Sequence, residues 1–299
     1  MSELISQLDL KRAARYNAKQ SYTLTPDILT SYPALSQPKQ STQFAEAVLF
    51  VQKDIGLHSH QQDAKLGRQT YQAIIQHLRG QYSEYVLLNE QKIQMPKSNH
   101  YSLITYDEPN GLDLHRYGNF SRRKKDISQL CLHWGGLNPK HCYNVFASNS
   151  RKVSSHFLIG LNKELQPIIY QVLDLKHKAW HAGKFNEKSI GIDICQQPTT
   201  KWKQYYDENG YQLNTIQNKT NRGPKNILEL HPLIIKATQE FITHLANALN
   251  INPSISNNPN LYNPNAILNG TYNIYCHSMV SAKKWDIAPY WNDIFNPEL

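Results

Sequence analysis

Cysteine is scarce in this chain of 299 residues, and its spacing argues against one class of metal site. The cysteines are Cys131, Cys142, Cys195 and Cys276, and none of them forms a Cys-x-x-Cys pair. A zinc site built from thiolates is therefore not expected. Free thiols are the default expectation, and the question of a disulfide stays open if the protein reaches an oxidising compartment.

Long apolar runs are also missing. No stretch is long enough to cross a bilayer as a helix, so no membrane insertion is expected. The first residues include the acids Glu3 and Asp9 and lack a continuous apolar core, which is unlike a secretory signal peptide. We expect synthesis in the cytoplasm, so action in the periplasm or cell wall would require release or injection.

Acidic residues are outnumbered by basic ones. The chain has 32 Lys and Arg against 23 Asp and Glu, which gives a formal net charge of +9. This excess favours a polyanionic partner, such as nucleic acid, an anionic membrane surface or an acidic cell-wall polymer. There is no dense Lys/Arg helix and no nucleic-acid motif, so we expect no nucleic-acid partner. The longest basic run, Arg122 to Lys125, is typical of a solvated loop.

The length of the chain predicts one large and one small domain. We place the small domain at residues 1–80 and the large one at 81–299, with linker and edge elements at 81–126. Two helices are expected in the small domain, the second spanning residues 69–78. Their inward-facing residues are Phe44, Val48, Val51 and Ile55 in the first helix and Ile74, Ile75 and Leu78 in the second.

The segment between these two helices, Asp63 to Thr70, reads Asp-Ala-Lys-Leu-Gly-Arg-Gln-Thr. It resembles the turn of the peptidoglycan-binding repeat, a three-helix module whose turn usually reads Asp-Gly-x-x-Gly-x-x-Thr. Ala64 stands in place of the first glycine, and the resemblance spans about residues 42–78. An ordinary helical hairpin is the alternative.

The rest of the chain contains several short apolar stretches that predict strands. These stretches are residues 101–106, 127–132, 155–160, 167–173, 189–195 and 273–276. Pro232 begins a helix whose apolar face comprises Leu233, Ala237, Phe241, Leu245 and Ala248. The polar segments 196–226 and 252–273 are expected to be surface loops.

Polar residues at the strand ends suggest a metal site. His133 and His277 each follow a predicted strand, and Asp286 lies on the loop after His277. Two imidazoles and a carboxylate can hold zinc with a fourth position free for water. Lys284 can reach the same water or an oxyanion, and Asp193 can take the water's proton. An ionised acid inside an apolar strand, as at Asp193, is costly to bury without a partner.

These residues occur within a series of motifs: Val153-Ser154-Ser155-His156-Phe157-Leu158-Ile159, Ala179-Trp180-His181-Ala182-Gly183, Ser189-Ile190-Gly191-Ile192-Asp193 and Lys284-x-Asp286. With His133 and His277, their order resembles the zinc-dependent N-acetylmuramoyl-L-alanine amidases of the type-2 amidase and peptidoglycan-recognition-protein superfamily. The resemblance covers about residues 130–289. It implies an α/β fold, with helices packed on a central mixed β-sheet and a zinc groove on one face.

The resemblance also implies roles for individual residues. His133, His277 and Asp286 would bind Zn²⁺, while Trp180 and His181 would line the groove and contact the sugar or peptide. Asp193 stands where recycling amidases carry a glutamate general base, and Lys284 where they carry a lysine that stabilises the transition state. Cys276 and Met279 replace residues that are usually Gly and Asp. The implied reaction cleaves the amide between N-acetylmuramic acid and L-alanine of the peptidoglycan stem peptide.

Several alternatives remain at this stage. A peptidoglycan-binding protein without turnover would keep the groove, although it need not retain three metal ligands. A zinc peptidase is disfavoured because there is no His-Glu-x-x-His helix. As an amidase, the protein would be an endolysin, an injected antibacterial effector or a cytosolic enzyme that recycles muropeptides. We expect a monomer, and an effector would have a cognate immunity protein and a secretion apparatus as partners.

Overall fold

Serine side chains begin two of the helices in the N-terminal part of the chain. The Ser6 hydroxyl accepts the Asp9 N–H at the start of α1, and the Ser41 hydroxyl accepts the Phe44 N–H at the start of α3. The elements here are α1 (Gln7–Asn17), α2 (Pro26–Ser31), η1 (Pro33–Ser36) and α3 (Thr42–Asp54). The computed structural model describes residues 6–22, 24, 26–57, 61–71, 73–74, 84–148, 150–197, 199, 202–219 and 225–295.

The chain divides into two units, Met1–Ser83 and Glu84–Leu299, and each is described by itself. In the first unit, Phe44, Val48 and Val51 of α3 are buried as expected, and Ile55 is partly buried. A further helix covers residues 68–71 and 73–74, and its Ile74 is buried. The other two predicted core residues of that helix, Ile75 and Leu78, lie outside the described residues.

Two buried amide side chains shape the turn that precedes this further helix. Gln52 accepts the Ala64 N–H and donates to Asp63, Thr70 and the Lys65 carbonyl. The Asn17 amide accepts the Leu66 N–H and donates to the Ala64 carbonyl. Ala64 itself has a φ of 62°, a conformation that glycine adopts at little cost. This backbone demand fits the glycine usual at that position in the repeat.

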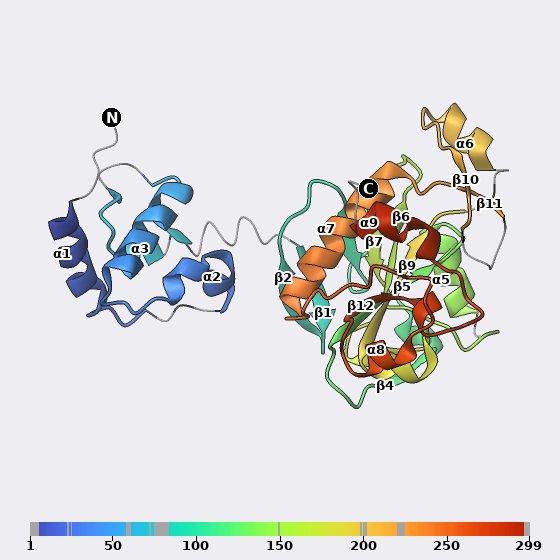
Figure 1. The fold of residues 1–299 in the computed structure, drawn as a ribbon, viewed down its shortest axis with the longest axis horizontal. Helices are drawn as coiled ribbons and strands as arrows, with labels where there is room; N and C mark the ends of the chain where they lie inside the picture. The colour runs from blue at the N-terminus through green and yellow to red at the C-terminus, as the bar shows by residue number, and fades with distance from the viewer. Residues whose placement is uncertain are drawn as a thin grey trace. The chain divides into compact units, whose positions relative to one another are not determined.

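The second unit is built on a six-stranded sheet with the order β12-β5-β9-β6-β7-β3 (Figure 1). Strands β6 and β7 pair antiparallel, and the other neighbouring pairs are parallel. The prediction of a mixed α/β sheet is therefore confirmed. The strands are β3 (Ser102–Thr105), β5 (Gln129–Trp134), β6 (Phe157–Leu161), β7 (Pro167–Gln171), β9 (Ser189–Cys195) and β12 (Ile274–Cys276).

Helices cover both faces of the sheet. Phe157 and Ile159 of β6 share a core with α7 (Pro232–Ala248), while Leu158 between them packs with α5 (Pro139–Ala147). The same alternation applies to β9, whose three isoleucines join the α7 core while Cys195 joins the α5 core. Asp193 is in phase with Cys195, so it faces the α5 side of the sheet.

Of the predicted α7 face, Ala237, Phe241 and Leu245 are buried, while Leu233 and Ala248 lie partly exposed at its flanks. The remaining elements are shorter. They are β1 (Glu84–Leu88), β2 (Gln91–Met95), η3 (His115–Tyr117), β4 (Phe120–Arg122), β8 (His177–Ala179), η4 (Gly183–Glu187), α6 (Lys203–Glu208), β10 (Thr215–Gln217), β11 (Asn226–Leu228), α8 (Pro264–Leu268), η6 (His277–Met279), η7 (Ala288–Tyr290) and α9 (Trp291–Phe295).

The prediction that residues 196–226 form only a surface loop is wrong. This segment contains α6 and the hairpin strand β10, which pairs with β11. Tyr206, Leu213 and Leu228 form a small core of their own. These apolar residues are separated by polar ones without a regular period, so the sequence pattern did not reveal them. The predicted loop at 252–273 likewise contains α8.

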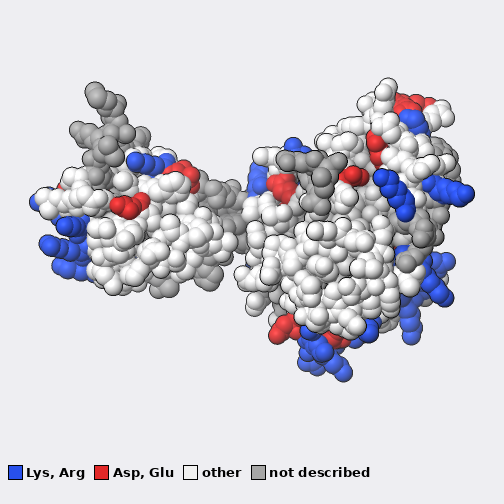
Figure 2. Space-filling view, in the orientation of Figure 1, with Lys and Arg blue, Asp and Glu red and all other residues white. Residues whose placement is uncertain are grey.

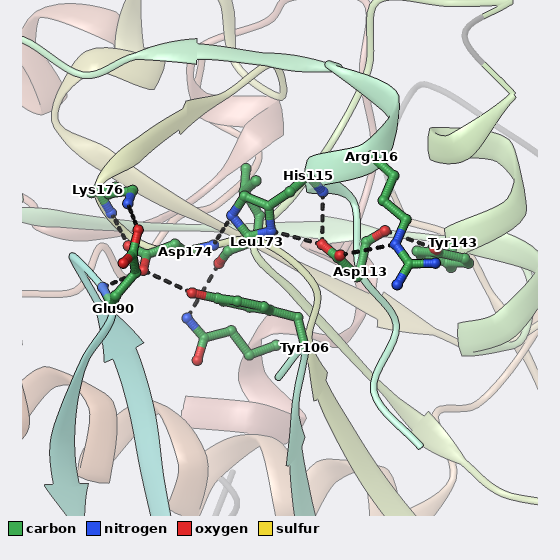
Figure 3. Close-up of polar contacts among 10 residues, drawn as sticks. Glu90, Tyr106, Asp113, His115, Arg116, Tyr143, Leu173, Asp174 and Lys176 are labelled. Carbon is green, nitrogen blue, oxygen red and sulfur yellow. Dashed lines mark hydrogen bonds and ion pairs between the residues drawn. The ribbon is translucent and has the colours of Figure 1, made fainter. Parts of the chain in front are cut away.

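A polar network joins the β1–β2 turn to the segment after β7 (Figure 3). The Asp174 carboxylate accepts the N–H groups of Asn89, Glu90 and Lys176 and the Tyr106 hydroxyl. Burial opposes ionisation, but these hydrogen bonds hold the pKa of Asp174 below its usual value. Because its acceptor capacity is taken up by the chain itself, we assign this cluster a structural role.

Figure 2 shows basic side chains gathered at the lower and right edges of the second unit. Among the described residues, no helix is long and apolar enough to cross a membrane. All four cysteines are buried free thiols, as the default expectation had it.

Candidate active site

Parallel pairing of β12 with β5 brings the two predicted histidine ligands together. Cys276 pairs with Leu132, so the residues that follow them, His277 and His133, lie side by side. Their Nδ1 atoms are 3.1 Å apart. His133 lies inside β5 and not beyond its end, because the strand begins and ends two residues later than predicted. His277 directly follows β12, as expected.

Asp286 completes the cluster from a loop. Its backbone has a φ of 42°, unusual for a residue with a side chain. The Trp134 N–H donates to Asp286 Oδ1 over 3.0 Å, which turns Oδ2 toward His277 Nδ1 at 3.2 Å. His133 Nδ1 is 3.9 Å from Oδ1. The three residues thus offer ligand atoms that all lie within 4.8 Å of one another.

The chemistry of this donor set fits a divalent metal. Asp286 Oδ2 is buried without a hydrogen-bond partner, and a buried carboxylate oxygen is costly to leave unsatisfied. Burial, together with His277, His181 and Lys284, holds the pKa of His133 well below its usual value, so its ring stays in the neutral form that metals bind. Two imidazoles and one carboxylate are ligands that zinc accepts.

A second group of possible ligands, Cys131, His133 and His181, lies nearby. Burial and the neighbouring Cys276 raise the pKa of the Cys131 thiol well above its usual value. A metal binds the thiolate and not the thiol. Moreover, His133 Nε2 is 2.9 Å from His181 Nδ1, a hydrogen-bond distance. The His133, His277 and Asp286 set is therefore the better metal site.

Asp193 lies beside this set on β9. Its register partner on the neighbouring parallel strand β5 is His133. The side chain is nearly buried, and the Ser155 hydroxyl donates a short hydrogen bond to Oδ2. Burial raises the pKa of Asp193 to about 7, with Asp286 adding to the rise and Ser155, His277 and Lys284 opposing it. A carboxyl group with this pKa can exchange protons near neutral pH.

One cavity of about 240 Å³ is lined by His133, Asp193, His277 and Asp286. Lys284 contributes an exposed cation to its lining, and Arg151 contributes another. An apolar part of the lining comes from α5 through Cys142, Val145 and Phe146. The cavity therefore combines metal-binding, proton-accepting and cationic groups, as hydrolysis of a polar substrate requires.

Two residues, Trp180 and His181, were predicted to contact the substrate. Trp180 lies outside the cavity lining, and the ring nitrogens of His181 already have partners within the protein. Trp180 is not among the residues that line the cavity, and its indole N–H donates to Ser121 Oγ over 3.4 Å. His181 reaches the cavity wall but is only 9% exposed, and both of its ring nitrogens have partners inside the protein. His156 is fully buried, with Nδ1 accepting the Gly191 N–H, a structural role.

Two serines of the site were missed in the sequence analysis. Ser155 binds Asp193, and Ser189 Oγ is 3.3 Å from His181 Nε2. Both belong to the motifs quoted above, Ser155 just before β6 and Ser189 at the start of β9. Their position in the motifs was the only available signal, since a serine in a strand has no chemistry of its own without a partner.

The comparisons with known proteins identify the family of this chain. The family model described as N-acetylmuramoyl-L-alanine amidase matches residues 123–287, more than half of the chain. No curated protein matches.

Several solved structures are similar. The catalytic domain of XlyA is 17% identical, with 64% of this chain and 96% of that chain covered, at a TM-score of 0.36. A mutant endolysin from Bacillus subtilis is 16% identical, with 65% and 96% covered, at a TM-score of 0.38. The amidase AmiD from E. coli, solved in complex with its substrate anhydro-N-acetylmuramic acid-L-Ala-D-gamma-Glu-L-Lys, is 18% identical, with 51% and 48% covered, at a TM-score of 0.32.

Proposed function

This chain belongs to the N-acetylmuramoyl-L-alanine amidase family, and we propose that it is a zinc-dependent hydrolase of the amide between N-acetylmuramic acid and L-alanine in peptidoglycan. One observation supports the metal and the chemistry together. His133, His277 and Asp286, whose Oδ2 has no hydrogen-bond partner, converge in one cavity with Asp193 and Lys284.

The chain's own residues have separate tasks in this proposal. His133, His277 and Asp286 would hold zinc, which supplies Lewis acidity and lowers the pKa of water at the site. Asp193 accepts the proton of the attacking water and delivers it to the departing amine of L-alanine. Lys284 provides positive charge where the tetrahedral oxyanion develops. The Ser155 hydroxyl holds the Asp193 carboxylate. The Asp193 side chain is one methylene shorter than the glutamate of the recycling amidases.

A binding protein without turnover is the alternative from another class. The Asp286 carboxylate argues against it, because a buried oxygen without a hydrogen bond lowers stability and serves no purpose in a groove that only binds. The raised pKa of Asp193 points in the same direction, since such shifts cluster at catalytic sites.

For the biological setting, we propose an endolysin or an injected antibacterial effector that acts in the periplasm or cell wall as a monomer. The peptidoglycan-binding-like turn of the first unit supports this over a recycling enzyme, which acts on small soluble fragments and needs no wall anchor. An effector would have a cognate immunity protein and a secretion apparatus. A neighbouring immunity gene would favour the effector, and a neighbouring holin gene the endolysin.

The test of the activity is digestion of purified peptidoglycan by the full chain. We expect one zinc per chain by elemental analysis, loss of activity with a chelator, and restoration by added zinc. Mass spectrometry should find peptides with a free amino-terminal L-alanine and glycan strands without peptide. Cleavage within the peptide or between sugars, or activity unchanged by the chelator, would contradict the proposal.

A further inference from the structure

A chain of buried hydrogen bonds runs away from the proposed metal site through His133. His133 Nε2 lies 2.9 Å from His181 Nδ1, and His181 Nε2 lies 3.3 Å from Ser189 Oγ. Ser189 Oγ in turn donates to the Phe185 carbonyl over 2.8 Å. The exposed fractions of His133, His181 and Ser189 are 5%, 9% and 0%, so this series of hydrogen bonds lies largely inside the protein.

The Phe185 carbonyl, at the end of this series of hydrogen bonds, determines which atom donates at each step. A carbonyl oxygen only accepts, so the Ser189 hydroxyl proton is used on Phe185, and Ser189 Oγ then accepts from His181 Nε2–H. A neutral imidazole carries a single ring proton, and the hydrogen bond to Ser189 places this proton on Nε2 of His181. With that proton on Nε2, His181 Nδ1 can only accept, and His133 must donate from Nε2.

The consequence reaches the metal site. A neutral His133 with its proton on Nε2 presents the Nδ1 lone pair, and Nδ1 is the atom that faces His277 and Asp286. The other tautomer would place a proton between these ligand atoms and oppose metal binding. The direction of the hydrogen bonds from Phe185 to His133 therefore selects the form of His133 that can bind a metal.

The position of the His181 ring is itself enforced by its surroundings. Asn186 Oδ1 accepts the backbone N–H groups of His181 and Ala182. Gly191 lies directly against the ring, and a Cβ at that position would be 2.8 Å from His181 Cγ. A side chain at residue 191 would thus push the ring away from its place. Gly191 of β9 therefore leaves the space that the His181 ring occupies.

We propose that His181 is a positioning residue, which with Ser189 fixes the tautomer and orientation of His133 for metal binding. This inference rests on the proposed function for the identity of the metal. It differs from the predicted role of His181 as a substrate contact, because both ring nitrogens are committed within the protein.

The tautomer is measured first, in the metal-free full chain. Long-range ¹H–¹⁵N correlation spectra distinguish a ring proton on Nε2 from one on Nδ1. We expect His133 to carry it on Nε2 in the wild type and to become mixed in His181→Leu and in Ser189→Ala. A wild-type His133 protonated on Nδ1, or a tautomer unchanged in both variants, would overturn the inference. This readout needs no zinc, so it remains decisive even if the metal proposal fails.

Zinc affinity is measured next, by competition with a chelator. Loss of a residue that orients a metal-binding histidine typically lowers affinity about 10- to 100-fold, which we expect for His181→Leu. His181→Asn should recover most of the affinity, because its Oδ1 can accept at the position of Nδ1. His231→Leu is the matched control, a buried histidine removed at the start of α7 and away from the site. It should lower thermal stability but leave zinc affinity unchanged.

The variants also separate positioning from packing. If His181→Leu does not fold, Ser189→Ala and His181→Asn carry the test, since each keeps most of the volume. Zinc affinities of His181→Leu and Ser189→Ala within twofold of the wild type would overturn the inference, as would equal losses in His181→Leu and His181→Asn. Absence of stoichiometric zinc in the wild type would count against the proposed function and not against the tautomer.

Discussion

At the scale of single residues, the candidate site concentrates groups that are unfavourable in a folded core. Asp193 and Asp286 are 8% exposed, and Asp286 also has a left-handed backbone. Neither feature helps the chain to fold, because buried charge and a positive φ both cost stability. Such costs persist at positions selected for chemistry, and this makes their removal informative.

Replacement of Asp193 by asparagine tests its role as the base. The variant keeps size and hydrogen bonding but cannot accept a proton, so zinc should stay bound while kcat falls. Positioned acid–base catalysis is worth on the order of 100- to 10,000-fold, and we expect a loss in that range. Steady-state hydrolysis of a soluble muropeptide measures it. Near-full turnover with zinc bound would show that the shorter side chain does not reach the water.

The same substitution should affect stability in the opposite direction. The pKa of Asp193 rises from 3.8 to about 7 on folding, so the folded chain binds more protons than the unfolded chain between these values. Stability of the metal-free protein therefore falls as pH rises from about 4 to 7 and stays lower above it. The amide of the variant does not ionise, so we expect Asp193→Asn to be stabilised at pH 8, by between about 1 and 4 kcal/mol. Thermal unfolding should show little difference at pH 4, and parallel pH profiles for the two proteins would contradict this account.

Lys284 and Asp286 lie two residues apart on one loop, but their substitution should have different effects. Lys284→Met keeps the apolar stem and removes the charge, so kcat should fall roughly 100- to 1,000-fold with zinc retained. Asp286→Ala removes a ligand, so zinc itself should be lost or bound weakly. Elemental analysis after dialysis, together with the kinetics, separates the two. Loss of zinc from Lys284→Met would show that Lys284 supports metal binding and would contradict its role in the reaction.

At the scale of elements, the sequence was most informative where burial covers whole strands. β9 was predicted with its observed bounds because every residue of this strand is buried and most are β-branched or small. The segment containing α6 and β10 was missed because its small core depends on a few scattered aromatic and apolar residues. Element boundaries elsewhere moved by up to a few residues, since hydrogen bonding between strands decides them.

The candidate site shows the same contrast between local signals and contacts that depend on the fold. His133 and His277 were proposed as ligands because each follows a predicted strand, and Asp286 because it lies on the loop after His277, which are local signals. The contact between His181 and His133 was not predicted, since it depends on how the segment between β8 and η4 packs against β9. A histidine within a Trp-His-Ala-Gly stretch has the polar edge of a substrate contact, and only the structure reveals that this edge is occupied.

The turn at Ala64 offers a test at this scale. Ala64 and Ala45 are both fully buried in the same small cluster, but Ala64 has a positive φ and Ala45 lies in α3. Glycine removes a methyl group at both sites, yet at Ala64 it also relieves a left-handed strain of about 1–2 kcal/mol. We expect Ala64→Gly to destabilise the first unit by at least about 1 kcal/mol less than Ala45→Gly. Equal losses in chemical denaturation would show that Ala64 is not strained.

At the scale of the whole molecule, the chain consists of two units with separate hydrophobic cores. The sequence analysis placed a boundary after residue 80, and the structure divides the chain after Ser83. What the first unit binds stays a proposal, because its resemblance rests on one turn. The sheet, the proposed metal ligands and the cavity all belong to the second unit.

Removal of the first unit should therefore separate wall binding from catalysis. A chain that begins at Glu84 keeps the complete sheet and the core that covers it, so it should fold and cleave a small soluble muropeptide at the rate of the full chain. Its retention on insoluble peptidoglycan should fall, because the proposed wall-binding turn is gone. Gln52→Leu in the full chain is the matched variant, since it breaks the hydrogen bonds that shape the turn without shortening the protein. It should reduce retention in a pull-down while soluble turnover stays unchanged. Equal retention of the full and shortened chains would assign wall binding to the catalytic unit alone, and the first unit would then serve transport or folding.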